Sequence, residues 1–336
     1  MKGLVCTNPY AFEYRDVALT PLKENHVLLK IRHIGICGTD LHAFEGTQPF
    51  FSYPRILGHE LAGDVVDWNG NTPSPFTRAT FIPYFNCGHC IACRNGKPNC
   101  CSTLNVCGVH SDGGMVEYLQ VPYDKLIPSE LSYEELALVE PLAIGAHAIR
   151  RADVRPGEFV LVVGAGPIGL GVMEFAHIAG GRVIAMDIND DRLSFCSSQL
   201  KVPYTVKASF PGATDNIREI TGGDMPTVVI DATGHLGAIE KSFELIAHGG
   251  RYVLVGLQRE RIGVLHPEFH KREATMMSSR NATREDFMHV LKSMKEGFVS
   301  PRTYITHRVT FGQLAQQFRS YLDPGSKVIK AMVNMD

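Results

Sequence analysis

The sequence has few features that would tie it to a membrane or to nucleic acid. No stretch reaches the roughly 18 consecutive apolar residues of a membrane-spanning helix, and the first residues, Met1-Lys-Gly-Leu-Val, lack the apolar run of a secretory signal peptide. Lys and Arg number 33 against 35 Asp and Glu. Because no long basic run occurs either, a groove for nucleic acid is not indicated. We therefore expect a cytoplasmic protein that binds neither partner.

The size and composition describe an ordinary globular protein with about two domains. A chain of 336 residues exceeds one ordinary hydrophobic core. Its 44% of hydrophobic and 20% of charged residues are usual for a folded protein. The nine cysteines occur without a secretory signal, so metal binding or reactive thiols explain them better than a disulfide framework does.

The chain changes character near Pro156-Gly157. Up to about Tyr123 it consists of short alternating or apolar runs separated by turns, which indicates a mostly β half. After the change, apolar runs alternate with amphipathic segments, which is typical of a parallel, doubly wound sheet. Strands are expected at 159–163, 182–186, 228–230 and 252–255, and helices at 167–179, 190–199 and 284–295. The tail 306–336 returns to strand-like runs, so we expect a mainly β domain made from both termini around an inserted α/β domain.

A helix is also expected just before the change. Ser132-Tyr-Glu-Glu135 has the pattern of a capping box, which marks a helix start. Pro141 then interrupts the pattern, and a residue before proline is disfavoured in helical conformation. We expect Glu140 at a break between two helical pieces, where its carboxylate can point sideways. The alternative is an ordinary residue on the helix surface.

Four cysteines lie within fifteen residues in the pattern Cys87-x-x-Cys90-x-x-Cys93 with Cys101. As thiolates they suit the tetrahedral preference of zinc, and four sulfurs leave no open coordination position. This four-cysteine cluster therefore predicts a structural zinc that folds a loop. The alternative is four unrelated thiols. Cys100 and Cys107 lie close by; either could substitute as a ligand, but we interpret them as ordinary small side chains.

A glycine-rich turn follows the expected strand at 159–163. Gly164-Ala-Gly166-Pro-Ile168-Gly169 has the G-x-G-x-x-G pattern at a helix start, where backbone N–H groups can meet a pyrophosphate. Asp187 ends the next expected strand, where a carboxylate can hold the ribose hydroxyls of NAD and repel the extra phosphate of NADP. Arg192 could stack on the adenine or be a solvated helix residue. The alternative to dinucleotide binding is a glycine-rich helix cap.

A second metal site is suggested by two further segments. Gly35-Ile-Cys37-Gly38-Thr39-Asp-Leu-His42 crowds a thiol, a hydroxyl, a carboxylate and an imidazole between two glycines, which we expect to form tight turns. Gly58-His59-Glu60 adds an imidazole and a carboxylate. Cys37, His59 and Glu60 could bind zinc and leave one position open, the pattern of a catalytic site. Alternatively, Cys37 is an inert buried thiol and the His-Glu pair a surface hydrogen bond.

These motifs together resemble the zinc-dependent medium-chain dehydrogenase/reductase family, in its polyol, sugar-acid and threonine dehydrogenase branch, over essentially the whole chain. The resemblance implies a GroES-like catalytic domain formed by residues 1–147 and 282–336, with a Rossmann NAD-binding domain at 148–281 and catalysis in the cleft between them. It also implies a homodimer or homotetramer that takes part in carbohydrate metabolism.

The resemblance interprets Glu140 as well. Simple alcohol dehydrogenases of the family have a cysteine at the corresponding position, whereas the polyol branch has a glutamate, as here. Glu140 would ligate the catalytic zinc or hold its water, with Glu60 in the other role, and the two could exchange during turnover. The stretch 269–287 looks like that of L-galactonate and L-idonate oxidoreductases, which favours a sugar acid or polyol. Arg280 within it could reach an acid group or neighbour the nicotinamide.

The implied mechanism begins with zinc as a Lewis acid that makes the substrate hydroxyl more acidic. Thr39 would accept the proton and pass it through the nicotinamide ribose to His42, which exchanges protons with solvent. Hydride transfer to NAD follows. Alternatively, Thr39 is a turn hydroxyl and His42 a satisfied helix-end residue. We interpret Asp40 as a residue that holds the loop by local backbone hydrogen bonds.

Two rival functions remain open on the sequence. One is an L-threonine or simple, sorbitol-like polyol dehydrogenase, which turnover on L-threonine, hexitols and hexonates would distinguish. The other is a noncatalytic zinc- and NAD-binding protein such as a sensor; the complete set of Cys37, Thr39, His59 and Glu60 argues against it.

Overall fold

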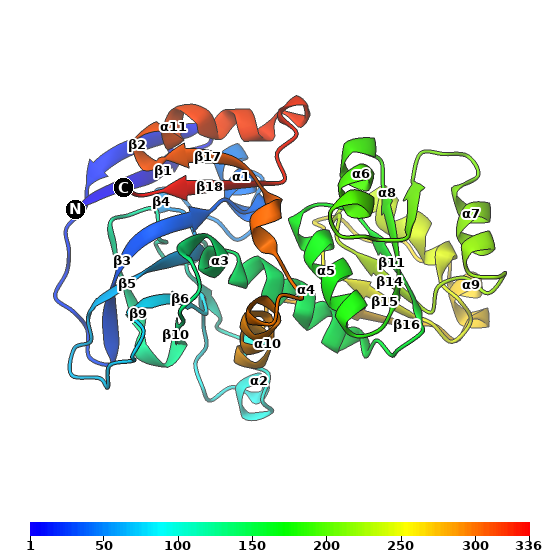
Figure 1. Cartoon of the computed structure of the whole chain (residues 1–336), viewed down its shortest axis with the longest axis horizontal. Coiled ribbons are helices and arrows are strands. Elements are labelled where there is room, and N and C mark those ends of the chain that lie inside the picture. The colour runs from blue at the N-terminus through cyan, green and yellow to red at the C-terminus, as the bar shows by residue number, and fades with distance from the viewer. The chain divides into compact units, whose positions relative to one another are not determined.

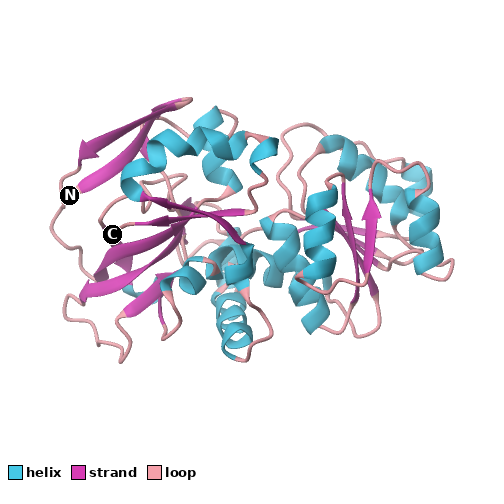
Figure 2. Cartoon of the chain, turned by 45° about the horizontal axis from the view of Figure 1, so that its top comes forward, coloured by secondary structure: helices cyan, strands magenta, loops and turns pink.

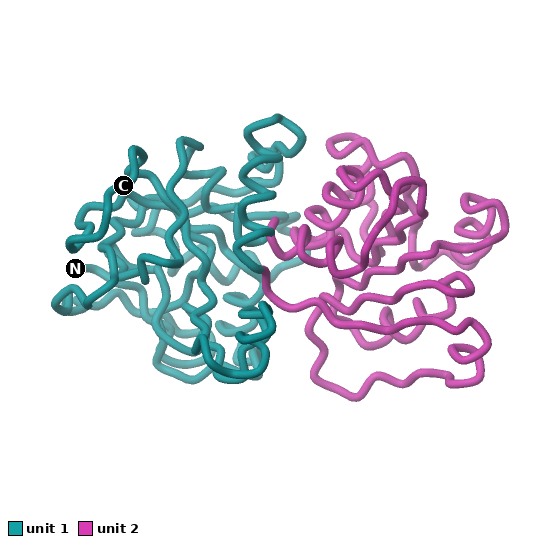
Figure 3. The backbone as a smooth tube through the Cα atoms, turned by 90° about the horizontal axis from the view of Figure 1, so that it is seen from below, with its two compact units in different colours: residues 1–141, 283–336 teal, residues 142–282 magenta.

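The computed structural model describes residues 1–336, which form two compact units (Figure 3). Unit 1 consists of Met1–Pro141 and Thr283–Asp336, and unit 2 of Leu142–Ala282. Helix α4 (Val139–Ala152) contains both this first boundary and the expected one at residue 147, and its first three residues belong to unit 1. The expected domain bounds stay a prediction. None of the helices has both the length and the apolar character that a membrane crossing requires.

Unit 1 is built mainly from strands, as expected (Figure 1). Its strands are β1 (Lys2–Asn8), β2 (Ala11–Asp16), β3 (His26–Gly35), β4 (Arg55–Ile56), β5 (Glu60–Asp67), β6 (Arg78–Phe81), β7 (Tyr84–Phe85), β8 (Asn105–Val106), β9 (Tyr118–Pro122), β10 (Leu126–Pro128), β17 (Ile305–Thr310) and β18 (Lys330–Asn334). Its helices are α1 (Gly38–Glu45), α2 (Ile91–Arg94), α3 (Tyr133–Ala137), α10 (Arg284–Lys295) and α11 (Leu314–Gln317).

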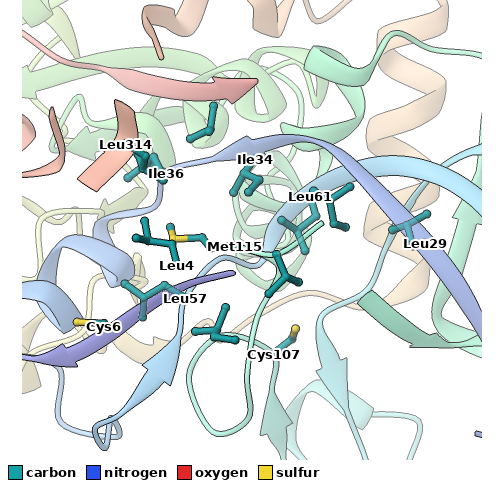
Figure 4. Close-up of a cluster of buried hydrophobic side chains, with 14 of the residues drawn as sticks. Leu4, Cys6, Leu29, Ile34, Ile36, Leu57, Leu61, Cys107, Met115 and Leu314 are labelled. Atoms are coloured by element: carbon teal, nitrogen blue, oxygen red, sulfur yellow. The ribbon is translucent and has the colours of Figure 1, made fainter. Parts of the chain in front are cut away.

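The main sheet of unit 1 joins the two ends of the chain. Its strands run in the order β10-β6-β5-β3-β18-β17, with β9 also paired to β3. The C-terminal strand β18 lies antiparallel to β3 with Val333 opposite Ile34. Alternate residues of β3, such as Val27, Leu29 and Ile31, are buried, because successive side chains of a strand point to opposite faces. Figure 4 shows part of the resulting core.

Unit 2 is a doubly wound sheet with the strand order β13-β12-β11-β14-β15-β16, all parallel. Its strands are β11 (Phe159–Val163), β12 (Arg182–Asp187), β13 (Tyr204–Lys207), β14 (Val228–Asp231), β15 (Arg251–Leu254) and β16 (Thr275–Ser278). Its helices are α5 (Pro167–Ile178), α6 (Asp190–Ser198), α7 (Ala213–Ile220), α8 (Leu236–Ser242) and α9 (His266–Lys271). Helices lie on both sides of these strands (Figure 2), so the central strands are almost wholly apolar.

The expected strands and helices of unit 2 and helix α10 are confirmed within a few residues. The tail differs from its expectation. Between β17 and β18 the chain forms α11 and several short 3-10 turns instead of further strands. Its apolar residues Leu314, Phe318 and Tyr321 are spaced three or four apart, and all three are buried in the core of unit 1, which is the spacing of a helical face.

Candidate metal centres and dinucleotide site

Cys37, His59 and Glu60 come together because strands β3 and β5 are paired. Strand β3 ends at Gly35 and β5 begins at Glu60, and the antiparallel register places these two residues opposite each other. One candidate ligand atom from each of Cys37, His59 and Glu60 lies within 4.8 Å of the other two. A thiolate, an imidazole and a carboxylate are ligand types of catalytic zinc sites. The structure thus brings three of the four expected catalytic ligands into one group.

Glycine is needed at position 35 because a side chain there would collide with Glu60, and not because the chain turns. The expectation of a tight turn at Gly35 is wrong, because the residue lies in strand β3 and has no positive φ. A Cβ atom at this position would come within 2.2 Å of Glu60 Oε2. Gly38 is the first residue of helix α1, and Cys37 is its N-cap. Glycine at position 35 therefore leaves the room that the Glu60 carboxylate occupies.

Asp40 connects the two ligand segments. It is 1% exposed, and its carboxylate accepts hydrogen bonds from the backbone N–H of Cys37 at 3.0 Å and of Gly58 at 3.2 Å. The expectation that Asp40 holds the loop by backbone hydrogen bonds is confirmed. The second bond reaches beyond its own loop, so Asp40 fixes the segment of His59 relative to that of Cys37.

His59 lies in a negative environment that suits a divalent cation. Burial alone would lower the pKa of His59, but Cys37, Asp40 and Glu140 together raise it well above the ordinary value. Its Nδ1 atom is buried without a hydrogen bond and lies 3.8 Å from Asp40 Oδ1. A metal ion bound here would neutralise the negative charge around His59 with its own positive charge. The residues present therefore fit a catalytic zinc.

Glu60 is bound by a lysine that the sequence analysis did not single out. Lys330, the first residue of β18, is 2% exposed and Glu60 is 0% exposed. The Lys330 ammonium donates to both carboxylate oxygens of Glu60 at 2.6 Å and to the Ile36 carbonyl at 3.1 Å. Burial would lower the pKa of Lys330, but the charge of Glu60 raises it above the ordinary value. The pair is therefore a buried ion pair with its donors satisfied.

Glu140 is held by a different partner. The Tyr84 hydroxyl donates a hydrogen bond to Glu140 Oε1, and both residues are 4% exposed. Burial is the main cause that raises the pKa of Glu140, the Glu60 charge adds to it, and His59 opposes it. The expected helix break lies at Leu138, not at Glu140, which is the second residue of α4. Pro141 is tolerated there, because the N–H groups of a first helical turn have no partner within the helix.

The two residues of the expected proton relay both lie on α1. Thr39 is half-buried and His42 is exposed. Positions three apart on a helix share one face. The His42 Nδ1 atom lies 3.1 Å from Thr47 Oγ1, a hydrogen bond whose direction depends on the tautomer. The arrangement leaves His42 open to solvent, as a terminal relay residue must be, and the relay itself stays a prediction.

The four-cysteine cluster is assembled as a zinc site. One sulfur from each of Cys87, Cys90, Cys93 and Cys101 lies within 4.8 Å of the others. The Cys90–Cys93 and Cys87–Cys101 Sγ distances are both 3.5 Å, close to the roughly 3.8 Å of a tetrahedral Zn–S₄ site. Hydrogen bonds from the backbone N–H groups of Cys93 and Ser102 lower the pKa of Cys90 to about 5, which favours the thiolate that zinc binds. Cys100 is exposed and Cys107 is buried elsewhere, and neither belongs to the group.

The glycine turn connects β11 to α5 with the geometry that the motif predicts. Gly164 has φ +100°, and a Cβ at Gly169 would lie 1.8 Å from the Gly164 carbonyl oxygen. At Gly166, the N-cap of α5, the nearest atom to such a Cβ would be Arg192 Nη1 at 3.9 Å. Gly164 and Gly169 are thus needed for the turn and its packing, whereas Gly166 leaves open space where a pyrophosphate could approach. Ile168, in the first turn of α5, is half-buried.

Besides its expected role at the ribose of NAD, Asp187 forms hydrogen bonds that hold the glycine turn. It ends β12 and is 7% exposed. Its Oδ2 accepts a hydrogen bond from Ala165 N at 2.6 Å and its Oδ1 one from Asn189 N at 2.9 Å. Asp187 therefore fixes the glycine turn to the end of the neighbouring strand. Arg192, on α6, lies beside Gly166 at the glycine turn. Whether it stacks on the adenine stays a prediction.

Arg280 is an exposed residue of unit 2, whereas the catalytic metal residues belong to unit 1. Its proposed contact with an acid group of the substrate stays a prediction. The residues that sequence reasoning missed are Tyr84 and Lys330. A weak signal existed for Lys330, because a lysine within the apolar run Val328-Ile-Lys-Ala-Met-Val333 needs a buried partner. No local signal marks Tyr84.

Comparisons with known proteins assign both parts of the chain to dehydrogenase domain families. The model of the alcohol dehydrogenase GroES-like domain matches residues 23–131, and that of the zinc-binding dehydrogenase matches residues 167–296. The L-galactonate-5-dehydrogenase of Escherichia coli (strain K12) is 42% identical over 339 residues, covering 99% of this chain and 98% of that protein. A sorbitol dehydrogenase of Halalkalibacterium halodurans is 29% identical over 303 residues, covering 88% and 87%.

A solved structure of similar fold covers the whole chain. The crystal structure of a short chain alcohol dehydrogenase from Escherichia coli CFT073, complexed with NADH, is similar with a TM-score of 0.92 and 28% identity. It covers 100% of this chain and 99% of that one.

Proposed function

This chain belongs to the zinc-dependent medium-chain dehydrogenase/reductase family, and we propose that it transfers a hydride between NAD and a secondary hydroxyl of a polyol or sugar acid, with an L-hexonate as the favoured substrate. Membership confirms the expected GroES-like and Rossmann domains and an oxidoreductase that uses zinc and a nicotinamide dinucleotide. The proposal rests on the group of Cys37, His59 and Glu60 and on Glu140, which lies outside that group but whose charge acts on His59. The sugar-acid substrate is supported by the 42% identical L-galactonate-5-dehydrogenase.

The residues of the proposed site divide the work. Cys37, His59 and one of the two carboxylates, Glu60 or Glu140, would hold the zinc, which when bound supplies Lewis-acid polarisation of the substrate hydroxyl. Thr39 would accept the hydroxyl proton, and His42 would deliver it to solvent. Asp40 would keep Cys37 and His59 in register through its two backbone hydrogen bonds. The hydride would go to the nicotinamide, which the protein positions.

A substrate screen tests this proposal. We expect aldonates and hexitols to be oxidised with NAD, with the highest kcat/KM on an L-hexonate, and strong chelation to abolish turnover while NAD binding persists. The measurement is NADH absorbance across polyols, aldonates and amino alcohols, with NAD and NADP in parallel. A preference for L-threonine would indicate an L-threonine dehydrogenase. A preference for hexitols would indicate a sorbitol-like polyol dehydrogenase. NAD binding without turnover on any alcohol would favour the noncatalytic protein.

Selection of NAD over NADP is proposed to depend on Asp187. Replacing it in Asp187→Ala removes the carboxylate that would repel the 2′-phosphate and would bind the ribose hydroxyls. We expect the ratio of kcat/KM for NAD to that for NADP to fall at least about tenfold, the effect of one charged hydrogen bond. Asp190→Ala removes the same charge from an exposed residue nearby and is the control. An equal change in both variants would contradict a specific role for Asp187.

We also propose a cytoplasmic location and assembly as a homodimer or homotetramer. All nine cysteines are free, and two zinc–thiolate sites need a reducing compartment. Strand β16 is at the edge of its sheet with Met276 exposed, so its backbone groups are available for pairing with another chain.

A further inference from the structure

Glu60, which belongs to the group with Cys37 and His59, and Glu140, whose charge acts on His59, are held in different ways. Glu60 uses both oxygens on one cation, Lys330, at 2.6 Å each. Glu140 uses one oxygen, Oε1, on the neutral hydroxyl of Tyr84. The other oxygen, Oε2, accepts no hydrogen bond from the protein. Glu140 therefore keeps one oxygen for a ligand, whereas both oxygens of Glu60 are engaged.

Tyr84 is suited to hold a carboxylate and has no other polar contact. Its hydroxyl is buried and forms only the bond to Glu140. A tyrosine hydroxyl keeps its proton at neutral pH, so in this contact it is the donor and the Glu140 carboxylate oxygen accepts. A phenol has one O–H to donate. That proton therefore goes to Glu140 Oε1 and fixes the rotation of the carboxylate.

The ring of Tyr84 is itself fixed from two sides. Its backbone belongs to β7, where it pairs with Val106 of β8. Its ring lies edge-on to Phe287 of α10, with 6.3 Å between ring centroids and 77° between planes. Phe287 is 0% exposed. The hydroxyl is thus delivered to Glu140 by packed elements and not by a mobile loop, which a positioning role requires.

We propose that Tyr84 is a positioning residue that holds the Glu140 carboxylate in place for the catalytic metal. This inference rests on the proposed function, in which Glu140 is a zinc ligand or holds the zinc-bound water. The partner of a metal-binding carboxylate commonly changes metal affinity or activity about 10- to 100-fold when it is removed. Strands β7 and β8 also flank the loop of the four-cysteine cluster, so the structural zinc would stabilise the strands that place Tyr84.

The test replaces Tyr84→Phe, which removes the hydroxyl and keeps the ring on Phe287. We expect kcat/KM to fall about 10- to 100-fold and catalytic-site zinc to be lost to a chelator faster by a similar factor. In protein with cobalt at that site, the visible absorption spectrum should change, because the carboxylate position at the metal changes. The matched control is Tyr252→Phe, a buried tyrosine of unit 2 whose hydroxyl lies 2.6 Å from Ser242 Oγ. It should leave spectrum and zinc retention unchanged.

An unchanged cobalt spectrum and unchanged zinc retention in Tyr84→Phe would overturn the proposal, even if activity fell. Tyr84→4-aminophenylalanine, which keeps a donor at the same place, should restore zinc retention. Failure of this rescue would also count against the proposal. Zinc retention of the 4-aminophenylalanine variant can be measured even if Tyr84→Phe does not fold. The double variant Tyr84→Phe/Glu140→Gln should retain zinc no worse than Glu140→Gln alone. If no polyol or aldonate is oxidised, the proposed function fails while the spectra still decide the role of Tyr84.

Discussion

Replacement of Lys330→Met is expected to destabilise the metal-free protein by about 3–5 kcal/mol, because it leaves the Glu60 carboxylate buried without a counter-charge. Glu60 is 0% exposed, and both of its oxygens accept their hydrogen bonds from Lys330. Urea and thermal unfolding, with and without zinc, measure the effect. We expect zinc to reduce the loss, because it supplies positive charge near Glu60.

The control for this prediction is Lys2→Met. Lys2 forms an ion pair of similar length, 2.9 Å, with Asp16, but both side chains are mostly exposed. Solvent screens such a pair, so we expect a much smaller change. The double variant Lys330→Met/Glu60→Gln should recover part of the stability, since it removes the unpaired charge. Equal stability of Lys330→Met and Lys2→Met would show that the buried ion pair does not stabilise the fold.

Cys101→Ser and Cys100→Ser are expected to have opposite outcomes although the residues are neighbours. Cys101 belongs to the four-cysteine cluster and is 2% exposed, whereas Cys100 is exposed and lies outside the cluster. Structural zinc sites bind with about 10–16 kcal/mol at neutral pH, so the loss of one of four sulfurs removes a large part of what folds the loop. We expect Cys101→Ser to hold one zinc per chain in place of two, and Cys100→Ser to hold both.

Zinc content and hydrogen exchange over residues 87–101 measure these outcomes. In Cys101→Ser the amides of the loop should exchange rapidly, because α2 is only one turn long and cannot persist alone. Strands β7 and β8 adjoin the loop, so their protection should fall as well. Two zinc ions per chain in Cys101→Ser, or loss of zinc in Cys100→Ser, would show that the ligand set is wrong.

The elements whose signals are local were predictable from the sequence. Strands β11 and β12 and helices α5, α6 and α10 follow from apolar periodicity and from caps, so the expected bounds differ from the observed ones by a few residues at most. The four-cysteine cluster and the glycine turn are likewise local, because all ligands or turn residues lie within a few positions of each other. Ligand type suggests that Cys37, His59 and Glu60 share one metal, and the resemblance to the family adds Glu140.

The sequence predictions were wrong at a proline and at a glycine, because each of these residues is compatible with more than one local structure. Pro141 was expected to break the helix at Glu140, but proline is compatible with a first helical turn, and the break lies at Leu138. The sequence pattern predicts a turn at Gly35, but glycine is also required where a neighbouring side chain fills the space that a Cβ atom would take. The register of β3 against β5, which brings Glu60 to that space, is not visible in either segment alone.

The sequence by itself determined which side chains can bind zinc and where a dinucleotide can meet a helix, because ligand type and turn chemistry depend on residues close together in the chain. Only the tertiary structure decided how the two carboxylates are held. Lys330 reaches Glu60 across 270 positions and Tyr84 reaches Glu140 across 56. These contacts are set by strand order and packing, which bring distant residues together regardless of their spacing. The pattern from Cys37 to Glu60 indicates a metal; the sheet determines which charges surround it.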